Sequence, residues 1–302
     1  MSDMIPGYRV QTAIGKGARS VIYHVVETRT GRSFILKRVV RQSAADHRFL
    51  EQVEREFRVT SAIEHPNLRH SIALHRKRKW LRVYELLLIA EYIEGQTLEE
   101  CLPDSLDELL AIYGQVCQGL HALHEAGYVH ADIKPHNILW SSEGVVKVID
   151  FGQSCHIGHR KKRIQGTPDY IAPEQVRRMP LDQRTDVFNL GATMYWALTG
   201  RAYPTDLGSD AMGTRVAVVG ARSPRSPREL DESVPLALSE LVMDCCRTNP
   251  SDRPANMSLV LKRIHAAAAI LERGRQTARP PVAAPPNGDS LTRPAGGGSP
   301  HE

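Results

Sequence analysis

The stretch His130-Ala-Asp-Ile-Lys-Pro-His-Asn137 decides the fold class of this 302-residue chain. It places a carboxylate (Asp132), an ammonium group (Lys134) and a carboxamide (Asn137) in one short segment. A carboxylate can accept or orient a hydroxyl proton, an ammonium group can neutralise a transferring phosphoryl group, and a carboxamide oxygen can bind a metal ion. An amphipathic segment, which predicts a helix, precedes the stretch, so we expect residues 130–137 to form the loop after that helix.

A second chemical motif, Asp150-Phe-Gly152, lies thirteen residues after Asn137. It follows the predicted strand Val145–Ile149, and a carboxylate at a strand end beside glycine suits Mg²⁺, which prefers oxygen ligands. A third motif, Ala172-Pro-Glu174, lies farther along the chain.

The first hundred residues are rich in short apolar or β-branched runs. They predict strands at Tyr8–Ile14, Val21–Val26 and Phe34–Val40, and two more strands around the turn Lys79–Leu81, the second of them at Leu86–Tyr92. Between these strands, the charged segment Ala45–Ile63 carries apolar residues at helical spacing and predicts a helix.

After Gly95 the apolar residues recur every three or four positions, which predicts a mainly helical region. The clearest helices are expected near residues 109–123, 187–198 and 257–271. Residues 205–234 are rich in turn-forming residues and predict a long surface loop. The Pro- and Gly-rich residues 273–302 predict a disordered tail.

Two features of the strand-rich region could bind phosphate. Gly15 and Gly17 lie between the first two strands, where backbone N–H groups could cover phosphate oxygens. Lys37 lies in the third strand and Glu56 in the following helix, so an ion pair between them could hold the ammonium group against phosphates.

Together these motifs resemble, in order and spacing, the signature set of the eukaryotic-type (Hanks-type) Ser/Thr protein kinase family. The resemblance covers residues 8–272 and implies an α+β, bilobal protein kinase fold. A small antiparallel-sheet N-lobe would span residues 8–93, and a larger, mainly helical C-lobe would span residues 94–272.

The resemblance also implies roles for individual residues. Asp132 would be the catalytic base and Lys134 would contact the γ-phosphate, while Asn137 and Asp150 would hold Mg²⁺, for which Mn²⁺ could substitute. The ATP site would be formed by Ile14, Gly15, Gly17, Ile22, Lys37, Glu56, Glu91, Ile93 and Leu139. Two contacts would be structural: Glu174 would pair with Arg253, and Asp186 would tie down the catalytic loop.

Two positions depart from the family pattern. Ser20 replaces the third glycine of the phosphate-covering hairpin, and Ala131 replaces the arginine that in many relatives meets a phosphate on the activation loop. Ala131 therefore makes activation by loop phosphorylation doubtful. The basic run His159–Arg163 could supply other cations or could be a solvated loop. These departures leave a pseudokinase, which binds nucleotide or a partner without turnover, as the alternative function.

The composition limits the binding partners and the cellular location that we expect for the protein. Lys and Arg exceed Asp and Glu by 39 to 34, partly through the run His75–Lys79. Such runs can bind nucleic acid or anionic membrane, so a nucleic-acid-binding scaffold is a further alternative. No aromatic interleaving accompanies these runs, so we expect a solvated hairpin at the first and no nucleic acid partner. The chain lacks an apolar stretch of roughly 20 residues, and its five cysteines lack metal-binding spacing. We expect a cytoplasmic protein without a membrane partner, with ATP and protein Ser/Thr substrates as ligands and separate partners for any regulation.

Overall fold

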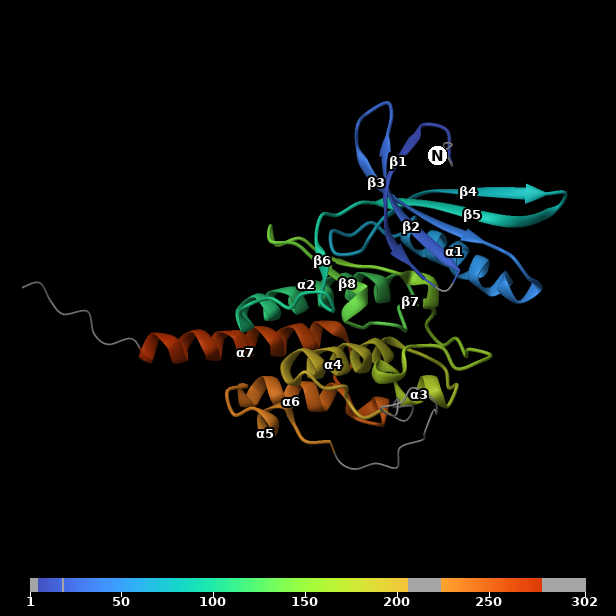
Figure 1. The fold of residues 1–302 in the computed structure, drawn as a ribbon. Coiled ribbons are helices and arrows are strands. Elements are labelled where there is room, and N and C mark those ends of the chain that lie inside the picture. Colours follow the sequence, from blue (N-terminus) through green and yellow to red (C-terminus); the bar gives the residue numbers. More distant parts are fainter. Residues whose placement is uncertain (1–4, 18, 206–223, 279–302) are drawn as a thin grey trace, which may run out of the picture.

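An antiparallel five-stranded sheet with one helix forms the N-terminal region, drawn in blue and cyan in Figure 1. The computed structural model of the protein describes residues 5–17, 19–205 and 224–278. The strands follow the order β1-β2-β3-β5-β4, with bounds β1 Tyr8–Lys16, β2 Ser20–Glu27, β3 Ser33–Val40, β4 Ser71–Lys79 and β5 Arg82–Glu91. The five strands predicted for the first hundred residues are thereby confirmed.

Alternation along β5 explains how the sheet is buried on both faces. Successive strand residues point to opposite faces, so Leu86 and Leu88 share one face while Leu87 and Ile89 share the other. The first pair packs with Leu50 and Val53 of α1 (His47–Thr60), and the second pair packs with apolar residues of β1, β2 and β3. The predicted helix is thus confirmed, although it ends at Thr60, before the predicted boundary at Ile63.

Helices form the C-terminal region below the sheet in Figure 1, and their apolar faces meet in the largest core of the molecule. The Ser105 hydroxyl accepts a hydrogen bond from the Glu108 N–H at 3.2 Å and caps the first long helix. The helices are α2 Leu106–Glu125, α3 Pro173–Val176, α4 Gln183–Thr199, α5 Pro227–Leu230, α6 Leu236–Cys245 and α7 Met257–Ala278. None of the helices within the described residues is long and apolar enough to cross a bilayer.

The three helices expected from periodicity correspond to α2, α4 and α7. Two expectations about the intervening and final segments need correction. The segment 205–234 contains α5, because Ser226 and Glu229 form a capping box at its start; residues 206–223 lie outside the described part of the chain. Helix α7 continues to Ala278, so the helix includes the first residues that were assigned to the tail, and residues 279–302 lie outside the described part.

Short strands position the loop 130–137. Strand β7 (Tyr128–Val129) ends where this loop begins, and β8 (Ile138–Trp140) starts where it ends. Strand β8 pairs with β6 (Gln96–Thr97) and β9 (Val146–Val148), while β7 pairs with β10 (Cys155–His156). Both ends of the loop are therefore anchored in hydrogen-bonded strands.

A buried ion pair braces the C-terminal region. Arg253 donates from Nη1 and Nη2 to the two carboxylate oxygens of Glu174 at 2.7 and 2.8 Å, and both residues are buried. The Thr185 hydroxyl adds a hydrogen bond to Glu174 at 2.9 Å. The pairing predicted from the resemblance is confirmed, and it joins α3, α4 and the segment before α7.

Replacing Arg253 by Met should destabilise the protein by about 3–5 kcal/mol, because the Glu174 carboxylate would remain buried without its partner. Urea denaturation followed by circular dichroism measures the effect. Arg247→Met is the matched control, since Arg247 forms an exposed ion pair with Asp244 and such pairs contribute little. Equal destabilisation by the two substitutions would show that the buried ion pair stabilises the protein no more than the exposed pair does.

Candidate active site

Three charged residues from three elements meet between the sheet and the helical region. The Lys37 Nζ in β3 lies 2.7 Å from Glu56 Oε2 in α1 and 3.0 Å from Asp150 Oδ1, which follows β9. Burial alone lowers the pKa of Lys37, but the charges of Asp150 and Glu56 outweigh it and raise that pKa above its ordinary value. The charge of Lys37 in turn holds the pKa of Asp150 well below its usual range. Lys37 and Asp150 are therefore both ionised near neutral pH.

A second cluster forms on the loop 130–137. The Thr167 hydroxyl donates to Asp132 Oδ1 at 3.0 Å, and the Lys134 ammonium donates to the same hydroxyl oxygen at 2.9 Å. Lys134 Nζ also lies 3.5 Å from Asp132 Oδ2. The structure thus brings together the carboxylate and the ammonium group that the sequence predicted, and adds Thr167 as a direct contact of both.

Asp186, in α4, holds the start of the loop 130–137. Its carboxylate accepts hydrogen bonds from the backbone N–H groups of His130 and Ala131 at 2.8 and 2.7 Å, and its Oδ2 lies 2.8 Å from His124 Nε2. Burial raises the pKa of Asp186, but the hydrogen bond with His124 and the neighbouring histidines outweigh burial and lower the pKa overall. The predicted tie between Asp186 and the loop is confirmed.

Asn137 and Asp150 present oxygen atoms that fit a magnesium ion. Asn137 is fully buried, its Nδ2 donates to the Asp132 carbonyl at 2.8 Å, and its Oδ1 has no hydrogen-bond partner. Asp150 adopts a left-handed backbone conformation with φ at 61°, and nearly half of its side chain is exposed. The Ile149 N–H donates to the Asn137 carbonyl at 3.0 Å, so the residue before Asp150 is hydrogen-bonded to Asn137. A buried amide oxygen without a donor, together with an ionised carboxylate on the adjoining segment, suits a cation that keeps ligands from water and phosphate.

The residues expected around the nucleotide lie on the sheet and on the segment that joins the two regions. Ile14, Gly15 and Gly17 belong to the β1–β2 hairpin, in which the Gly17 N–H donates to the Ser20 carbonyl at 2.8 Å. Ile22 pairs directly with Lys37 across β2 and β3, and Leu139 lies in β8. Glu91 ends β5 and Ile93 follows it.

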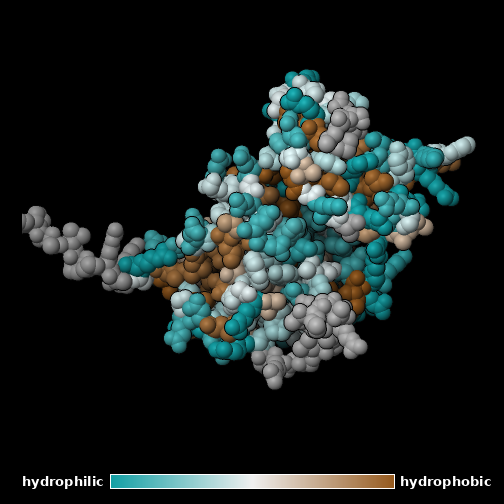
Figure 2. Space-filling view, in the orientation of Figure 1, coloured by the Kyte–Doolittle hydropathy of each residue, from teal (hydrophilic) through white to brown (hydrophobic). Residues whose placement is uncertain are grey.

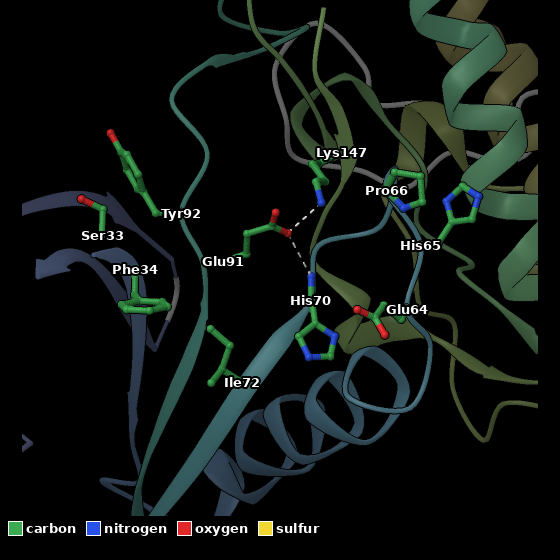
Figure 3. A pocket seen from close by; sticks show the side chains of 10 residues that line it. All are labelled: Ser33, Phe34, Glu64, His65, Pro66, His70, Ile72, Glu91, Tyr92 and Lys147. Carbon is green, nitrogen blue, oxygen red and sulfur yellow. Dashed lines mark hydrogen bonds and ion pairs between the residues drawn. The ribbon is translucent and has the colours of Figure 1, made fainter. Parts of the chain in front are cut away.

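The Glu91 side chain is used for another contact. Figure 3 shows it beside Lys147, whose ammonium group lies 2.8 Å from Glu91 Oε2, in a pocket of about 470 Å³ that also exposes His70 and Tyr92. None of the residues of the two charged clusters lines this pocket. The Glu91 side chain therefore contacts Lys147 and this pocket rather than either charged cluster.

Comparison with known proteins agrees with this geometry. The sequence profile described as "Protein kinase domain" matches residues 8–264. The chain belongs to the protein kinase domain family. Its relatives include the Ser/Thr protein kinase PknL of Mycobacterium tuberculosis, with 35% identity over 82% of this chain and 62% of PknL, and PrkC of Bacillus subtilis, with 29% identity over 82% of this chain and 38% of PrkC. The chain thus spans less than two thirds of the length of each of these relatives.

The start of the activation segment of this kinase domain, residues 150–174, is held by one cation from the basic run His159–Arg163 and by one that the sequence did not single out. Lys161 is buried and donates to the Gln153 carbonyl at 2.6 Å, and Arg55 of α1 donates to the Gly152 carbonyl at 3.0 Å. Burial lowers the pKa of Lys161 from its ordinary value. The basic run His159–Arg163 is therefore neither wholly solvated nor wholly buried: four of its residues are exposed, and Lys161 turns inward.

Residues 155–166 contain no Ser, Thr or Tyr. The hydroxyls that flank this stretch are Ser154, which is fully buried, and Thr167, which contacts Asp132. Residues 155–166 thus contain no hydroxyl group that could accept a phosphate. Ala131, which replaces the arginine of many relatives, could not bind such a phosphate either. Lysine and arginine contacts with backbone carbonyls hold the start of the activation segment instead.

Replacing Lys161 by Met should loosen the start of the activation segment, because the Gln153 carbonyl would lose its charged donor. Such a hydrogen bond contributes about 1.5–3 kcal/mol, so local amide exchange near residues 151–156 should rise roughly tenfold or more. Hydrogen–deuterium exchange with mass spectrometry measures this change. Lys162→Met, at the exposed neighbour, should leave exchange unchanged, and identical profiles for the two variants would contradict the assigned contact.

Proposed function

We propose that this chain is a Ser/Thr protein kinase that transfers the γ-phosphate of ATP to protein hydroxyl groups. The observation that carries the proposal is the contact of Thr167 with Asp132. Asp132 already accepts a hydrogen bond from a hydroxyl group, at 3.0 Å, which is the contact that a general base makes with the hydroxyl that it activates. Lys134 lies close enough to stabilise negative charge at the same place.

In the proposed reaction the substrate hydroxyl approaches Asp132 and gives its proton to the carboxylate as its oxygen bonds to the γ-phosphorus. The bond between that phosphorus and the bridging oxygen breaks, and ADP leaves with the electron pair. Lys134 neutralises charge on the transferring group, and Lys37, fixed by Glu56, holds the α- and β-phosphates. These residues act by orientation and charge, since phosphoryl transfer needs little covalent help from the protein.

Asn137 and Asp150 are the residues that would hold the metal ion. Magnesium, when bound, neutralises the phosphate oxygens and favours departure of ADP. Among the described residues, no group of three or more His, Cys, Asp and Glu side chains could hold a metal by itself. A site formed by one amide and one carboxylate therefore depends on phosphate oxygens for further ligands, so metal and ATP would bind together.

Ile14, Gly15, Gly17, Ile22, Leu139 and Ile93 complete the proposed ATP site, with the backbone of Glu91. Gly17 matters because a Cβ built on it would lie 2.6 Å from the Ser20 hydroxyl oxygen, in a hairpin that must approach phosphate closely. Ser20, which departs from the family pattern, is thus accommodated because residue 17 is a glycine.

Both alternatives from the sequence lose support. A pseudokinase would need neither the Asp132–Thr167–Lys134 cluster nor an ionised Asp150, and both are present. A nucleic-acid-binding scaffold would need a continuous basic surface, whereas several cations of the two basic runs are engaged: Arg76 pairs with Glu54, Lys77 with Glu85, and Lys161 with a carbonyl.

Asp132→Asn should lower phosphate transfer from labelled ATP to a generic protein substrate by about 100- to 10,000-fold, because the base is lost while the loop keeps its hydrogen bonds. Lys37→Met should have a similar effect through loss of the phosphate contact. Lys262→Met, at an exposed position on α7, is the matched lysine control and should keep most activity. Equal transfer by wild type and Asp132→Asn, or none by wild type, would reject the proposal.

Chelation of divalent metal should abolish transfer, and Mg²⁺ or Mn²⁺ should restore it. Asn137→Ala should raise the Mg²⁺ concentration for half-maximal rate by about tenfold, because one of two protein ligands is removed. Titration of the rate with Mg²⁺ at saturating ATP measures the shift. Asn249→Ala, at a surface helix cap, should leave the titration unchanged.

The proposal extends to location and partners. ATP and reduced thiols are both available in the cytoplasm, and all five cysteines of this chain are free thiols. Protein substrates with Ser or Thr, and separate regulatory proteins, are the partners that such an enzyme requires.

A further inference from the structure

The hairpin formed by β4 and β5 projects beyond the body of the molecule and ends in two large apolar residues. Figure 1 shows it extending to the right, at the opposite side from the C-terminal end of α7. Lys79 pairs with Arg82, so Trp80 and Leu81 form the two-residue turn at the tip. Their relative exposures are 92% and 93%, the highest among the large apolar residues that the structure describes.

Cations surround this apolar tip in two groups. The inner two are engaged in ion pairs: Arg76 pairs with Glu54 at 3.2 Å and Lys77 with Glu85 at 3.3 Å, and Glu85 is shared with Arg38 of β3. The outer three, namely Arg78, Lys79 and Arg82, form no ion pair with any described residue. In Figure 2 this projecting end shows teal, hydrophilic atoms beside pale and brown ones. The end of the hairpin thus has free positive charge around exposed apolar surface and no carboxylate from residue 75 to residue 84.

The backbone of the tip does not favour these residues. Trp80 has φ at 57°, in the region that glycine adopts freely and bulky residues rarely do. A two-residue hairpin turn with positive φ at its first position normally carries glycine there. No aromatic or cation–π contact holds Trp80 within the described residues. Folding alone therefore does not account for a tryptophan at this position, and strain of this kind is concentrated at functional sites.

We propose that the β4–β5 hairpin tip, residues 78–82, docks on the surface of an anionic lipid bilayer. Tryptophan is favoured at the level of the lipid headgroups, leucine is favoured below it, and a cluster of Lys and Arg is attracted by anionic headgroups. The arrangement matches that gradient, since the apolar pair lies at the extreme tip and the free cations lie just behind it.

A bilayer fits these residues better than a nucleic acid. Nucleic-acid surfaces combine a basic groove that follows the phosphate backbone with aromatic platforms for bases. This hairpin projects from the molecule rather than forming a groove. Its aromatic residues are Trp80 at the tip and the less exposed Tyr84 in β5, and the turn places an aliphatic residue, Leu81, beside Trp80 that no base would require. The proposal departs from the sequence-based expectation of a solvated hairpin and no membrane partner. That expectation rested on the basic run His75–Lys79, and the structure adds the exposed turn of Trp80 and Leu81.

Flotation of the purified chain with vesicles tests the proposal. Binding to phosphatidylcholine vesicles with about 30 mol% phosphatidylglycerol should be at least tenfold stronger than binding to phosphatidylcholine alone, and should weaken with salt. Trp80→Ser/Leu81→Ser should reduce binding to the anionic vesicles by about tenfold or more. Lys79→Ser/Arg82→Ser should reduce it similarly and flatten its salt dependence.

Leu236→Ser is the matched control, because Leu236 is 57% exposed on α6 in the other region, and it should bind as wild type does. Thermal unfolding identifies any variant that fails to fold. Because both tip residues are highly exposed, replacing them should leave the fold intact. Absence of wild-type binding to anionic vesicles, or equal binding by wild type and Trp80→Ser/Leu81→Ser, would overturn the proposal. The proposal would also be overturned if wild type bound a single-stranded oligonucleotide more tightly than the anionic vesicles and Trp80→Ser/Leu81→Ser left that binding unchanged.

Discussion

The catalytic loop depends on one buried carboxylate, that of Asp186. A charge with no exposed surface is unfavourable unless donors surround it, and here two backbone N–H groups and a histidine nitrogen do so. Those two N–H groups belong to His130 and Ala131, and Ala131 has φ at 60°, a conformation that is unfavourable for a residue with a side chain. The hydrogen bonds to Asp186 thus stabilise a backbone turn that the loop would not otherwise adopt. Asp132 follows this turn directly, so its position is determined by a contact made below the site.

How far the sequence predicts the structure varies with the kind of feature. The positions of Asp132, Lys134, Asn137 and Asp150 could be predicted because few residue types perform each chemical task, and their spacing along the chain is short or conforms to a known pattern. The strands and long helices could be predicted because their apolar residues are periodic. Helix α6 was missed because most of its short length is apolar, which gives no clear period, and the end of α7 was misplaced because helix-forming residues continue past its last apolar contact.

The two basic runs show what composition cannot reveal. In both runs the sequence offers consecutive cations, and nothing in it distinguishes Lys161, which turns inward to the Gln153 carbonyl, from its exposed neighbour Lys162. Only the fold around β10 determines which side chain is buried. In the hairpin the same ambiguity is resolved by pairing: Glu54 and Glu85 form ion pairs with the cations near the body, and the cations beside Trp80 form none with the described residues. A run of like charges is therefore a set of separate environments rather than one surface.

The distinction between binding ATP and transferring phosphate can also be argued from energetics. A module that only bound nucleotide would need Lys37 and the sheet that holds it, and could tolerate an apolar residue at Asp132. Here Asp132 is mostly buried, with 11% of its side chain exposed, and charged and hydroxyl groups satisfy it. The Asn137 oxygen is buried without a donor, which is unfavourable by about 1–3 kcal/mol unless a ligand satisfies it. The unsatisfied Asn137 oxygen is unfavourable for folding alone, and a metal ion bound at the proposed site, near the proposed base Asp132, would satisfy it.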